Sequence, residues 1–271
     1  VMGVGSLNIT ENVSGFADVA DTKSERPYTG AGATLGTGQT TNFNSSGIAD
    51  PFQIILPIGH PDNPFPTARA SVSVRLEDKL RTQTTTNENA RAMAGLKGSN
   101  YGFDWETAVL WNRSERLQEY DNFFYIPTLK KINTGTSMAT LFKDPTLTKD
   151  VKNKGSAEIM QWDAKATTEF GKLGGGAIGL ATGVEFREER IVLAPDSDLA
   201  SGNILGLANS VIDGSRKVSS AFIELRTPFL KNFEMDFAGR FDKYPGIKAN
   251  FVPKVGAKWN VNDSLSFRST Y

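Results

Sequence analysis

The stretch Phe233-Glu234-Met235-Asp236-Phe237-Ala238-Gly239-Arg240-Phe241-Asp242 decides the fold class of this 271-residue chain. Aromatic and aliphatic side chains occupy alternate positions, and charged side chains occupy most of the positions between them. Successive side chains of a strand point to opposite faces, so one face is strongly apolar and the other strongly charged. Such contrast exceeds that of most strands in soluble sandwiches and is typical of a wall between lipid and water.

The same period of two continues along much of the chain, whereas helical periodicity is nearly absent. Trp259 and Phe267 belong to the apolar sets of the two following segments, with Lys258 and Arg268 opposite. Earlier segments with this pattern include residues 90–97, 101–112, 160–170 and 178–187. The sequence therefore predicts an all-β fold of about ten antiparallel strands, each about 10 to 14 residues long.

The amino-acid composition of the chain excludes several classes of function. Hydrophobic residues make up 39% of the chain, below the usual share of a soluble globular protein, while aromatic residues make up 10%. The 30 basic and 30 acidic residues balance, which argues against a nucleic-acid partner. There are no cysteines, so disulfides, thiol catalysis and cysteine-ligated zinc are excluded. We expect no cofactor, no metal site and no catalytic residues, hence not an enzyme.

The lengths of the connections alternate. Tight turns are predicted at residues 10–12, 97–100, 173–176, 228–232 and 261–263. Long connections are predicted at residues 24–70, 116–157 and 191–215, with one short one at 244–249. In an up-and-down sheet this parity places every tight turn at one end, as in outer-membrane barrels with short periplasmic turns and long extracellular loops. The segment from Ala70 to Gln83 would break the parity, so we interpret it as an extension above the membrane.

Three stretches of the last 100 residues resemble the TonB-dependent receptors, large outer-membrane barrels that import scarce nutrients. They are the Gly-rich turn and strand of residues 175–189, the segment 218–232, and residues 238–244 followed by 253–256 and 265–271. The resemblance implies a barrel of 22 strands around an N-terminal plug domain. Because the chain begins and ends within apparent strands, we expect residues 1–271 to be part of the barrel domain, without the plug and both true termini.

The resemblance also implies a location and partners. The location is the outer membrane of a Gram-negative bacterium, and the partners are outer-membrane lipid, the plug of the same chain, the TonB complex and a small-molecule nutrient. The nutrient class stays open among siderophore-bound iron, cobalamin and oligosaccharides. Two alternatives to the receptor remain: a non-transport outer-membrane or soluble β module for adhesion or binding, and a barrel hydrolase, which a single histidine makes a poor candidate.

Candidate site residues fall into two groups. The first is predicted to line the lumen and to pack against a plug, or alternatively to contact substrate. Its members are Glu185, Arg187, Glu234, Asp236, Arg240, Asp242, Lys254, Lys258 and Arg268. The second lies in the predicted long loops as candidate substrate contacts. Its members are His60, Asp62, Asn63, Phe65, Tyr120, Phe123, Phe124 and Tyr125.

Each loop candidate also has a structural interpretation. His60 is expected to be an exposed loop residue, with a substrate contact as the alternative. The aromatic residues 120–125 could stack on a ligand, or they could be the buried anchor of a folded loop. The Gly-rich segment 30–40 matches no phosphate-binding motif, since Gln39 stands where such a loop needs lysine.

Overall fold

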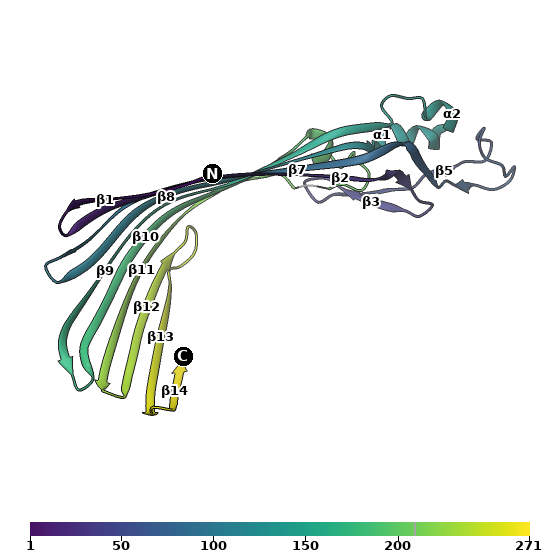
Figure 1. Cartoon of the computed structure of the whole chain (residues 1–271). Helices are drawn as coiled ribbons and strands as arrows, with labels where there is room; N and C mark the ends of the chain where they lie inside the picture. Colours follow the sequence, from purple (N-terminus) through teal and green to yellow (C-terminus); the bar gives the residue numbers. More distant parts are fainter. Residues whose placement is uncertain (209) are drawn as a thin grey trace.

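A computed structural model of the chain describes residues 1–208 and 210–271. Its main feature is one antiparallel sheet of ten strands in the order β1-β2-β7-β8-β9-β10-β11-β12-β13-β14. Each strand pairs with its neighbours along the chain, and β1 and β14 form the two open edges (Figure 1). The predicted all-β, up-and-down architecture of about ten strands is confirmed.

The strands of this sheet are β1 (Met2–Thr10), β2 (Val13–Leu35), β7 (Val74–Asn100), β8 (Phe103–Phe124), β9 (Thr148–Leu173), β10 (Gly176–Pro195), β11 (Ile212–Leu230), β12 (Phe233–Lys243), β13 (Asn250–Asn262) and β14 (Leu265–Thr270). Six of them, β2 and β7 to β11, run for 19 to 27 residues. The predicted length of 10 to 14 residues is therefore wrong for these six. Polar residues on both faces hid their outer halves from a test of hydrophobic alternation.

All five tight turns lie at one end of the sheet, as the parity of the connections predicts (Figure 1). The turn between β7 and β8 consists of Tyr101 and Gly102, whose φ angles of 55° and 79° are those of a two-residue hairpin turn. The predicted position of this turn at residues 97–100 is wrong. Gly98 is paired with Trp105 in the ladder, and the Trp105 ring covers the bare glycine backbone.

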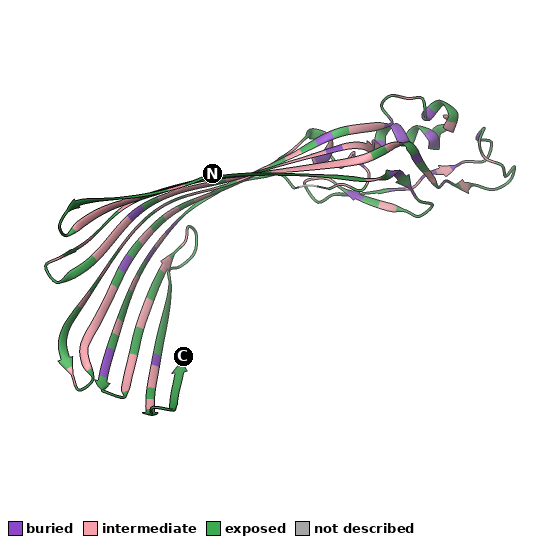
Figure 2. Cartoon of the chain, in the orientation of Figure 1, coloured by how far each residue is buried: buried purple, intermediate pink, exposed green. Residues whose placement is uncertain are grey.

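The long connections fold together at the other end into a compact region that we call the cap. Its elements are β3 (Thr40–Phe43), β4 (Ala49–Phe52), β5 (Ile55–Leu56), β6 (Ala70–Ser71), α1 (Ile126–Leu129), the 3-10 helix η1 (Lys130–Thr134), α2 (Met138–Leu141) and α3 (Ser197–Ala200). Buried side chains from two connections share one core, with Phe52, Ile54 and Leu56 packed among Leu129 and Ile132. Most of the buried residues in Figure 2 belong to this region.

The segment from Ala70 to Gln83 divides between two elements. Its first residues form β6, which pairs with β5, and from Val74 onward it is the start of β7. That part of β7 pairs with β2 as far as Leu35, in the region next to the cap. The segment therefore extends an existing strand and does not add a further one to the wall.

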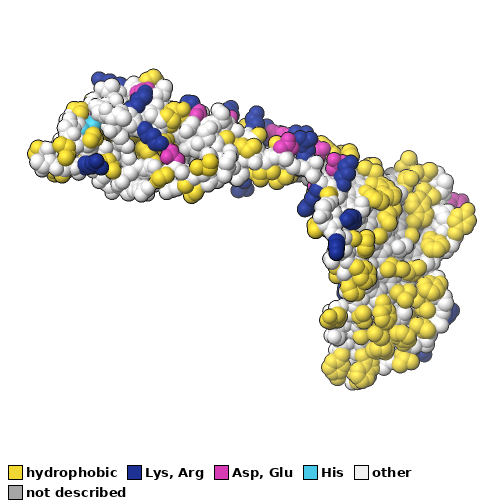
Figure 3. Space-filling model, turned by 180° about the vertical axis from the view of Figure 1, so that it is seen from behind, with side chains coloured by type: hydrophobic (Ala, Val, Ile, Leu, Met, Phe, Trp, Pro, Cys, Tyr) yellow, Lys and Arg dark blue, Asp and Glu magenta, His cyan; other side chains and the backbone are white. Residues whose placement is uncertain are grey.

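The wall below the cap has two chemically different faces. On one, Trp162 stacks on Phe186 at 5.6 Å between ring centroids, and Trp259 contacts Phe267 at 6.2 Å. Figure 3 shows this apolar face as a continuous hydrophobic surface over the curved part of the sheet. The alternate positions of the same strands carry charged and small side chains and form the charged face. Among the described residues, no helix is long and apolar enough to cross a membrane.

Candidate functional site

Strand register concentrates charged side chains on one face of β10, β11 and β12. Glu185, Ser220 and Asp242 are direct partners across these three strands. Arg187 lies two residues from Glu185 on the same face, and its guanidinium binds the carboxylates of Glu185 at 2.8 Å and Glu189 at 2.7 Å. Since each carboxylate contacts a guanidinium, the network is largely neutral and rigid.

Arg240 and Arg216 extend this network to the flanking strands. Arg240 donates to Asp242 at 3.0 Å and lies 3.9 Å from Glu185, while Arg216 donates to Glu189. The hydroxyl of Ser220 also donates to Asp242. Three arginines therefore alternate with three carboxylates across three strands, an arrangement that fixes the relative positions of the strands through their side chains.

A second ion-pair group surrounds Glu234 nearer to the tight turns. Its carboxylate accepts from Arg226 at 2.8 Å and lies 3.5 Å from the Lys258 ammonium. Beside it the charged face contains a hollow of about 750 Å³, lined by Asp236, Lys254 and Arg226 among others. The space exists because Gly179, Ala181 and Ala238 present little or no side chain there.

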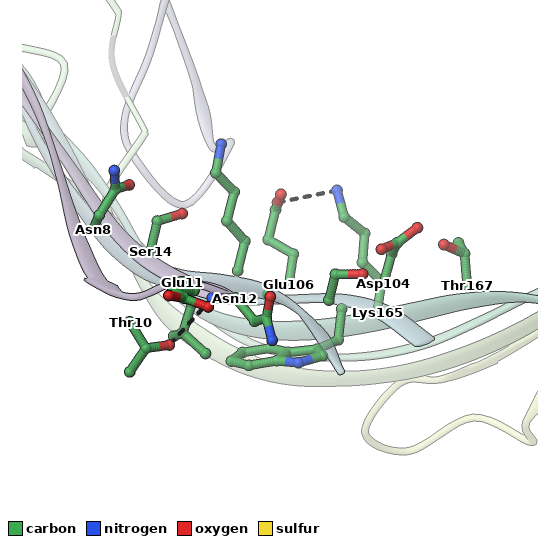
Figure 4. Close-up of a pocket in the computed structure, with 14 residues that line it drawn as sticks. Asn8, Thr10, Glu11, Asn12, Ser14, Asp104, Glu106, Lys165 and Thr167 are labelled. Atoms are coloured by element: carbon green, nitrogen blue, oxygen red, sulfur yellow. Dashed lines mark hydrogen bonds and ion pairs between the residues drawn. The ribbon is translucent and has the colours of Figure 1, made fainter. Parts of the chain in front are cut away.

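Another hollow, of about 450 Å³, lies on the charged face close to the tight turns. Figure 4 shows Asn8 and Ser14 at one side of it, with Glu106 and Lys165 joined by an ion pair of 3.0 Å. Asp104 and Thr167 line the hollow next to this ion pair. The charged face therefore offers polar concavities of a size to receive loops or side chains, and its carboxylates are mostly counter-paired.

All nine predicted lumen residues lie on the charged face, as the pairing of Glu234 with Lys258, Ala238 with Lys254 and Lys258 with Arg268 requires. Sequence reasoning did not select Arg226, Arg216 or Lys165, although each forms an ion pair on this face. The alternation within Glu224-Leu225-Arg226 already contains the signal for Arg226. Contact of these residues with a plug or a substrate stays a prediction.

The cap gives the loop candidates around His60 structural roles. His60 is buried, not exposed as predicted, because its ring lies against the second long connection with Nε2 3.1 Å from the Thr136 carbonyl. Asp62 accepts from the Met138 backbone N–H at 2.6 Å and so caps α2. Asn63 donates to three carbonyls of its own loop. Phe65 is 53% exposed, and Asp62 is also exposed although its carboxylate is engaged.

The aromatic candidates anchor the cap, the second of the two interpretations offered by the sequence. Phe124 is buried in the larger core, and Tyr120 is buried with Leu199 and Ile204 from the third long connection. The Phe123 ring packs edge to face against the Tyr120 ring, with 5.7 Å between the ring centroids. The Arg81 guanidinium lies over the Phe123 ring, 5.4 Å from its centroid. Burial raises the pKa of the Tyr120 hydroxyl.

Ion pairs fasten the cap from two sides. Asp144 accepts from Lys131 and Thr146, and these bonds hold its pKa well below the ordinary value. Burial alone would raise the pKa of Asp198, but hydrogen bonds from Lys149 and Asn203 outweigh it and lower the pKa. The hydrogen bond that Lys149 donates to Asp198 raises the pKa of Lys149, whose ammonium also lies 4.5 Å from the Tyr125 ring centroid. Both acids are ionised and structural at neutral pH.

Within the described residues no three His, Cys, Asp or Glu side chains are grouped as metal ligands. The site is a charged, concave wall below a folded cap. A family model described as TonB dependent receptor-like, β-barrel, matches residues 15–271. The chain belongs to the TonB-dependent receptors. In such a barrel the apolar face of the wall contacts lipid and the charged face lines the lumen.

Solved structures of TonB-dependent receptors have the same fold. The ferripyoverdine receptor of the outer membrane of Pseudomonas aeruginosa, bound to ferripyoverdine, superposes with a TM-score of 0.53 at 14% identity over 97% of this chain. The complex of FpvAI with pyocin S2 gives a TM-score of 0.52 at 14% identity over 99% of this chain. The chain spans 33% of the length of each of these two relatives. No curated protein sequence matches it.

Proposed function

We propose that this chain is part of the barrel wall of an outer-membrane receptor that takes up a scarce small-molecule nutrient with energy supplied by TonB. The observation that carries the proposal is the two-faced sheet of ten strands, matched over residues 15–271 by the receptor barrel. Its apolar face would contact outer-membrane lipid, and its charged face would contact a plug domain supplied by the parent chain. The wall would bind and guide, without covalent chemistry.

Siderophore-bound iron is the nutrient we favour over cobalamin and oligosaccharides. The ferripyoverdine receptor, which superposes with a TM-score of 0.53, is bound to ferripyoverdine in its structure. At 14% identity that likeness concerns the fold. Our preference for a siderophore therefore rests on a shared architecture and not on matched binding residues. The nine lumen residues would then hold the plug, and the cap would close the outer entrance.

Uptake by the parent protein tests this function directly. A strain lacking the gene, a strain lacking TonB and the complemented strain would be compared for uptake of labelled ferric chelates, cobalamin and an oligosaccharide. We expect one nutrient to be lost equally in both deletion strains and restored by complementation. Unchanged uptake of all three nutrients, or uptake that does not need TonB, would contradict the proposal.

Fractionation of the complemented strain separates the alternatives. A receptor of this class should be recovered with the outer membrane and remain there after a high-salt wash. Recovery in the soluble fraction would favour a β module for adhesion or binding. Recovery in the outer membrane without any TonB-dependent uptake would favour a barrel with a non-transport role.

A further inference from the structure

Charges are sorted by face in the part of the wall directly below the cap. Ser24, Asn87 and Arg116 are direct partners across β2, β7 and β8. Their side chains therefore share the charged face, which we call the lumen face here because the proposed barrel would turn it to the lumen. Arg26 lies two residues beyond Ser24 and therefore points to the same face. Around Arg26 and Arg116 the lumen face carries amide and hydroxyl side chains and no carboxylate on these three strands.

In this part of the wall, the acidic residues of the same strands point to the other face. Glu88 pairs there with Lys23 at 2.5 Å. Glu115 pairs with Arg113, and Glu119 pairs with Lys152 at 2.7 Å. Three of the acidic residues on this face are therefore paired with cations. The positive charge on the lumen face in this region comes from its arginines.

Arg26 and Arg116 are exposed and make no side-chain hydrogen bond or ion pair with the described residues. This sets them apart from the arginines lower on the same face, such as Arg187 and Arg240, which are bound to carboxylates. Both line a hollow of about 490 Å³, which they share with Tyr28, Gln83 and Asn87 among others. The hollow thus combines two free guanidinium groups with an exposed phenol and uncharged hydrogen-bonding groups.

A neighbouring hollow of about 470 Å³ continues this surface across the wall and shares Arg116 and Asn87 with the first. Its lining includes Ser114, Asn89 and, on the far side, the aliphatic Leu193. Glu88 and Glu115 also belong to its lining, but their side chains point to the other face, where Lys23 and Arg113 bind their carboxylates. The two hollows together form a polar trough whose unpaired charge is positive.

We propose that Arg26 and Arg116 recognise the anionic groups of the transported substrate, which rests on the proposed uptake function and narrows it to a small molecule with separated, negatively charged oxygen groups. A guanidinium presents a planar fork of N–H donors that matches carboxylate and phosphate oxygens in pairs. Arg26 and Arg116 lie on strands separated by one other strand, and they are offset by two residues along the strand direction. Their Cα atoms are therefore roughly 12 Å apart. A ligand with one anionic group would pair with only one of the two arginines, and a neutral sugar would form an ion pair with neither.

The test compares full-length protein in detergent with variants on the two faces of the same strands. The lumen pair is R26Q/R116Q, and the matched control is K23Q/R113Q, which removes as much positive charge from the outer face. Isothermal titration would use citrate and inorganic tripolyphosphate as anionic probes and maltotriose as the neutral probe. We expect R26Q/R116Q to weaken binding of an anionic probe about tenfold or more and K23Q/R113Q to change it less than about twofold.

Other outcomes overturn the inference. Equal losses in the two variants would mean that net charge and not the trough attracts the anions. Failure of both anions to bind the unaltered protein at about 10 mM would also overturn it. If R26Q/R116Q does not fold, R26K/R116K keeps the charges without the planar forks and should still weaken binding. A fall in the unfolding temperature with unchanged binding would show that the two arginines pair with acids elsewhere in the parent protein.

The outcome is distinguishable from failure of the uptake proposal. TonB-dependent uptake of a neutral nutrient, unaffected by R26Q/R116Q, would leave the receptor function standing and remove the anion site. Anion binding that depends on both arginines, in a protein without TonB-dependent uptake, would support the anion site and contradict the uptake function.

Discussion

Aromatic rings of this wall cover glycines on neighbouring strands. Gly183 of β10 is the direct partner of Phe222 of β11, and an added Cβ at Gly183 would lie 2.4 Å from the Phe222 ring and 2.9 Å from the Ala164 carbonyl oxygen. Phe16 lies over Gly95 in the same way. Such pairs hold strand register on the lumen face, because a slip of one residue would move the ring away from the only position that has room for it.

Replacement of Gly183 by alanine should therefore destabilise the wall. We expect G183A to lower the free energy of unfolding by about 1 to 3 kcal/mol, the usual cost of overpacking. Urea unfolding of the full-length protein followed by tryptophan fluorescence measures it. G214A is the matched control, since an added Cβ at Gly214 of β11 meets nothing within 4 Å. The interpretation fails if the two variants unfold alike, or if F222A does not relieve the effect of G183A.

Asp144 gives the cap a dependence on acid. Its pKa is lowered by hydrogen bonds from Lys131 and Thr146, so its contribution to stability is complete above the pKa of an unfolded aspartate, about 3.9. That contribution decreases as the pH falls from there toward the lower folded-state value. Hydrogen exchange of residues 142–147, corrected for intrinsic rates, should show loosening below about pH 4 and none between pH 7 and 5. D144N should remove this change, and a change that persists in D144N would assign it to another group.

At the scale of elements, Asn42 of β3 joins two connections that are far apart in the sequence. Its buried amide donates to the carbonyls of Gly202 at 2.9 Å and Ile204 at 2.6 Å, and its oxygen accepts from the Gly206 N–H at 3.2 Å. Ile204 in turn is fully buried beside Tyr120. One side chain of the first connection thus holds the third connection in place, next to strand β8.

Loss of this amide should open the cap and leave the wall intact. We expect N42A to expose residues 196–208 to limited proteolysis, because two buried carbonyls lose their hydrogen-bond donor at about 1 to 3 kcal/mol each and the partly buried Gly206 N–H loses its acceptor. The strands below the cap should keep their hydrogen-exchange protection. T41A alters the exposed neighbour and serves as the control. Equal proteolysis of N42A and the unaltered protein would mean that the apolar cores alone hold the third connection.

At the scale of the whole molecule, the two faces of the wall make opposite demands on a charge. Phe186 lies on the apolar face and stacks on Trp162, whereas Thr167 of β9 lies exposed on the charged face. Arginine on the lipid-facing side of a barrel costs about 2 to 4 kcal/mol near the bilayer midplane. An equal charge on the lumen side remains hydrated.

F186R should therefore reduce the amount of protein assembled in the outer membrane, and T167R should leave it nearly unchanged. Membrane fractions of cells that express each variant of the full-length protein would be compared by quantitative immunoblotting. The opposite order would reverse the assignment of the faces, and equal levels would contradict a wall in contact with lipid.

Period-two alternation predicted the strands of the wall and the common face of the nine residues proposed to line the lumen. It succeeds because the two sides of each strand differ sharply in polarity, as lipid and water on the two sides of a barrel wall require. Residues such as Thr85 and Gln118 carry no such contrast, so the outer halves of the long strands resembled loops. The prediction of an exposed His60 was wrong, and the role of Tyr120 and Phe124 was left open, for a different reason. Their neighbours come from other connections, and no local pattern records which connections meet.

The sequence by itself determined the all-β class, the parity of the turns, the apolar and charged faces and the resemblance to TonB-dependent receptors. Each of these follows from side chains that are close along the chain or that repeat with the period of a strand. Only the tertiary structure decided that the long connections form a cap with its own core. It also decided that Arg187 binds carboxylates, whereas Arg26 and Arg116 have no side-chain partner among residues 1–208 and 210–271. Those outcomes depend on strand register and on contacts across more than a hundred residues, which no short stretch of sequence specifies.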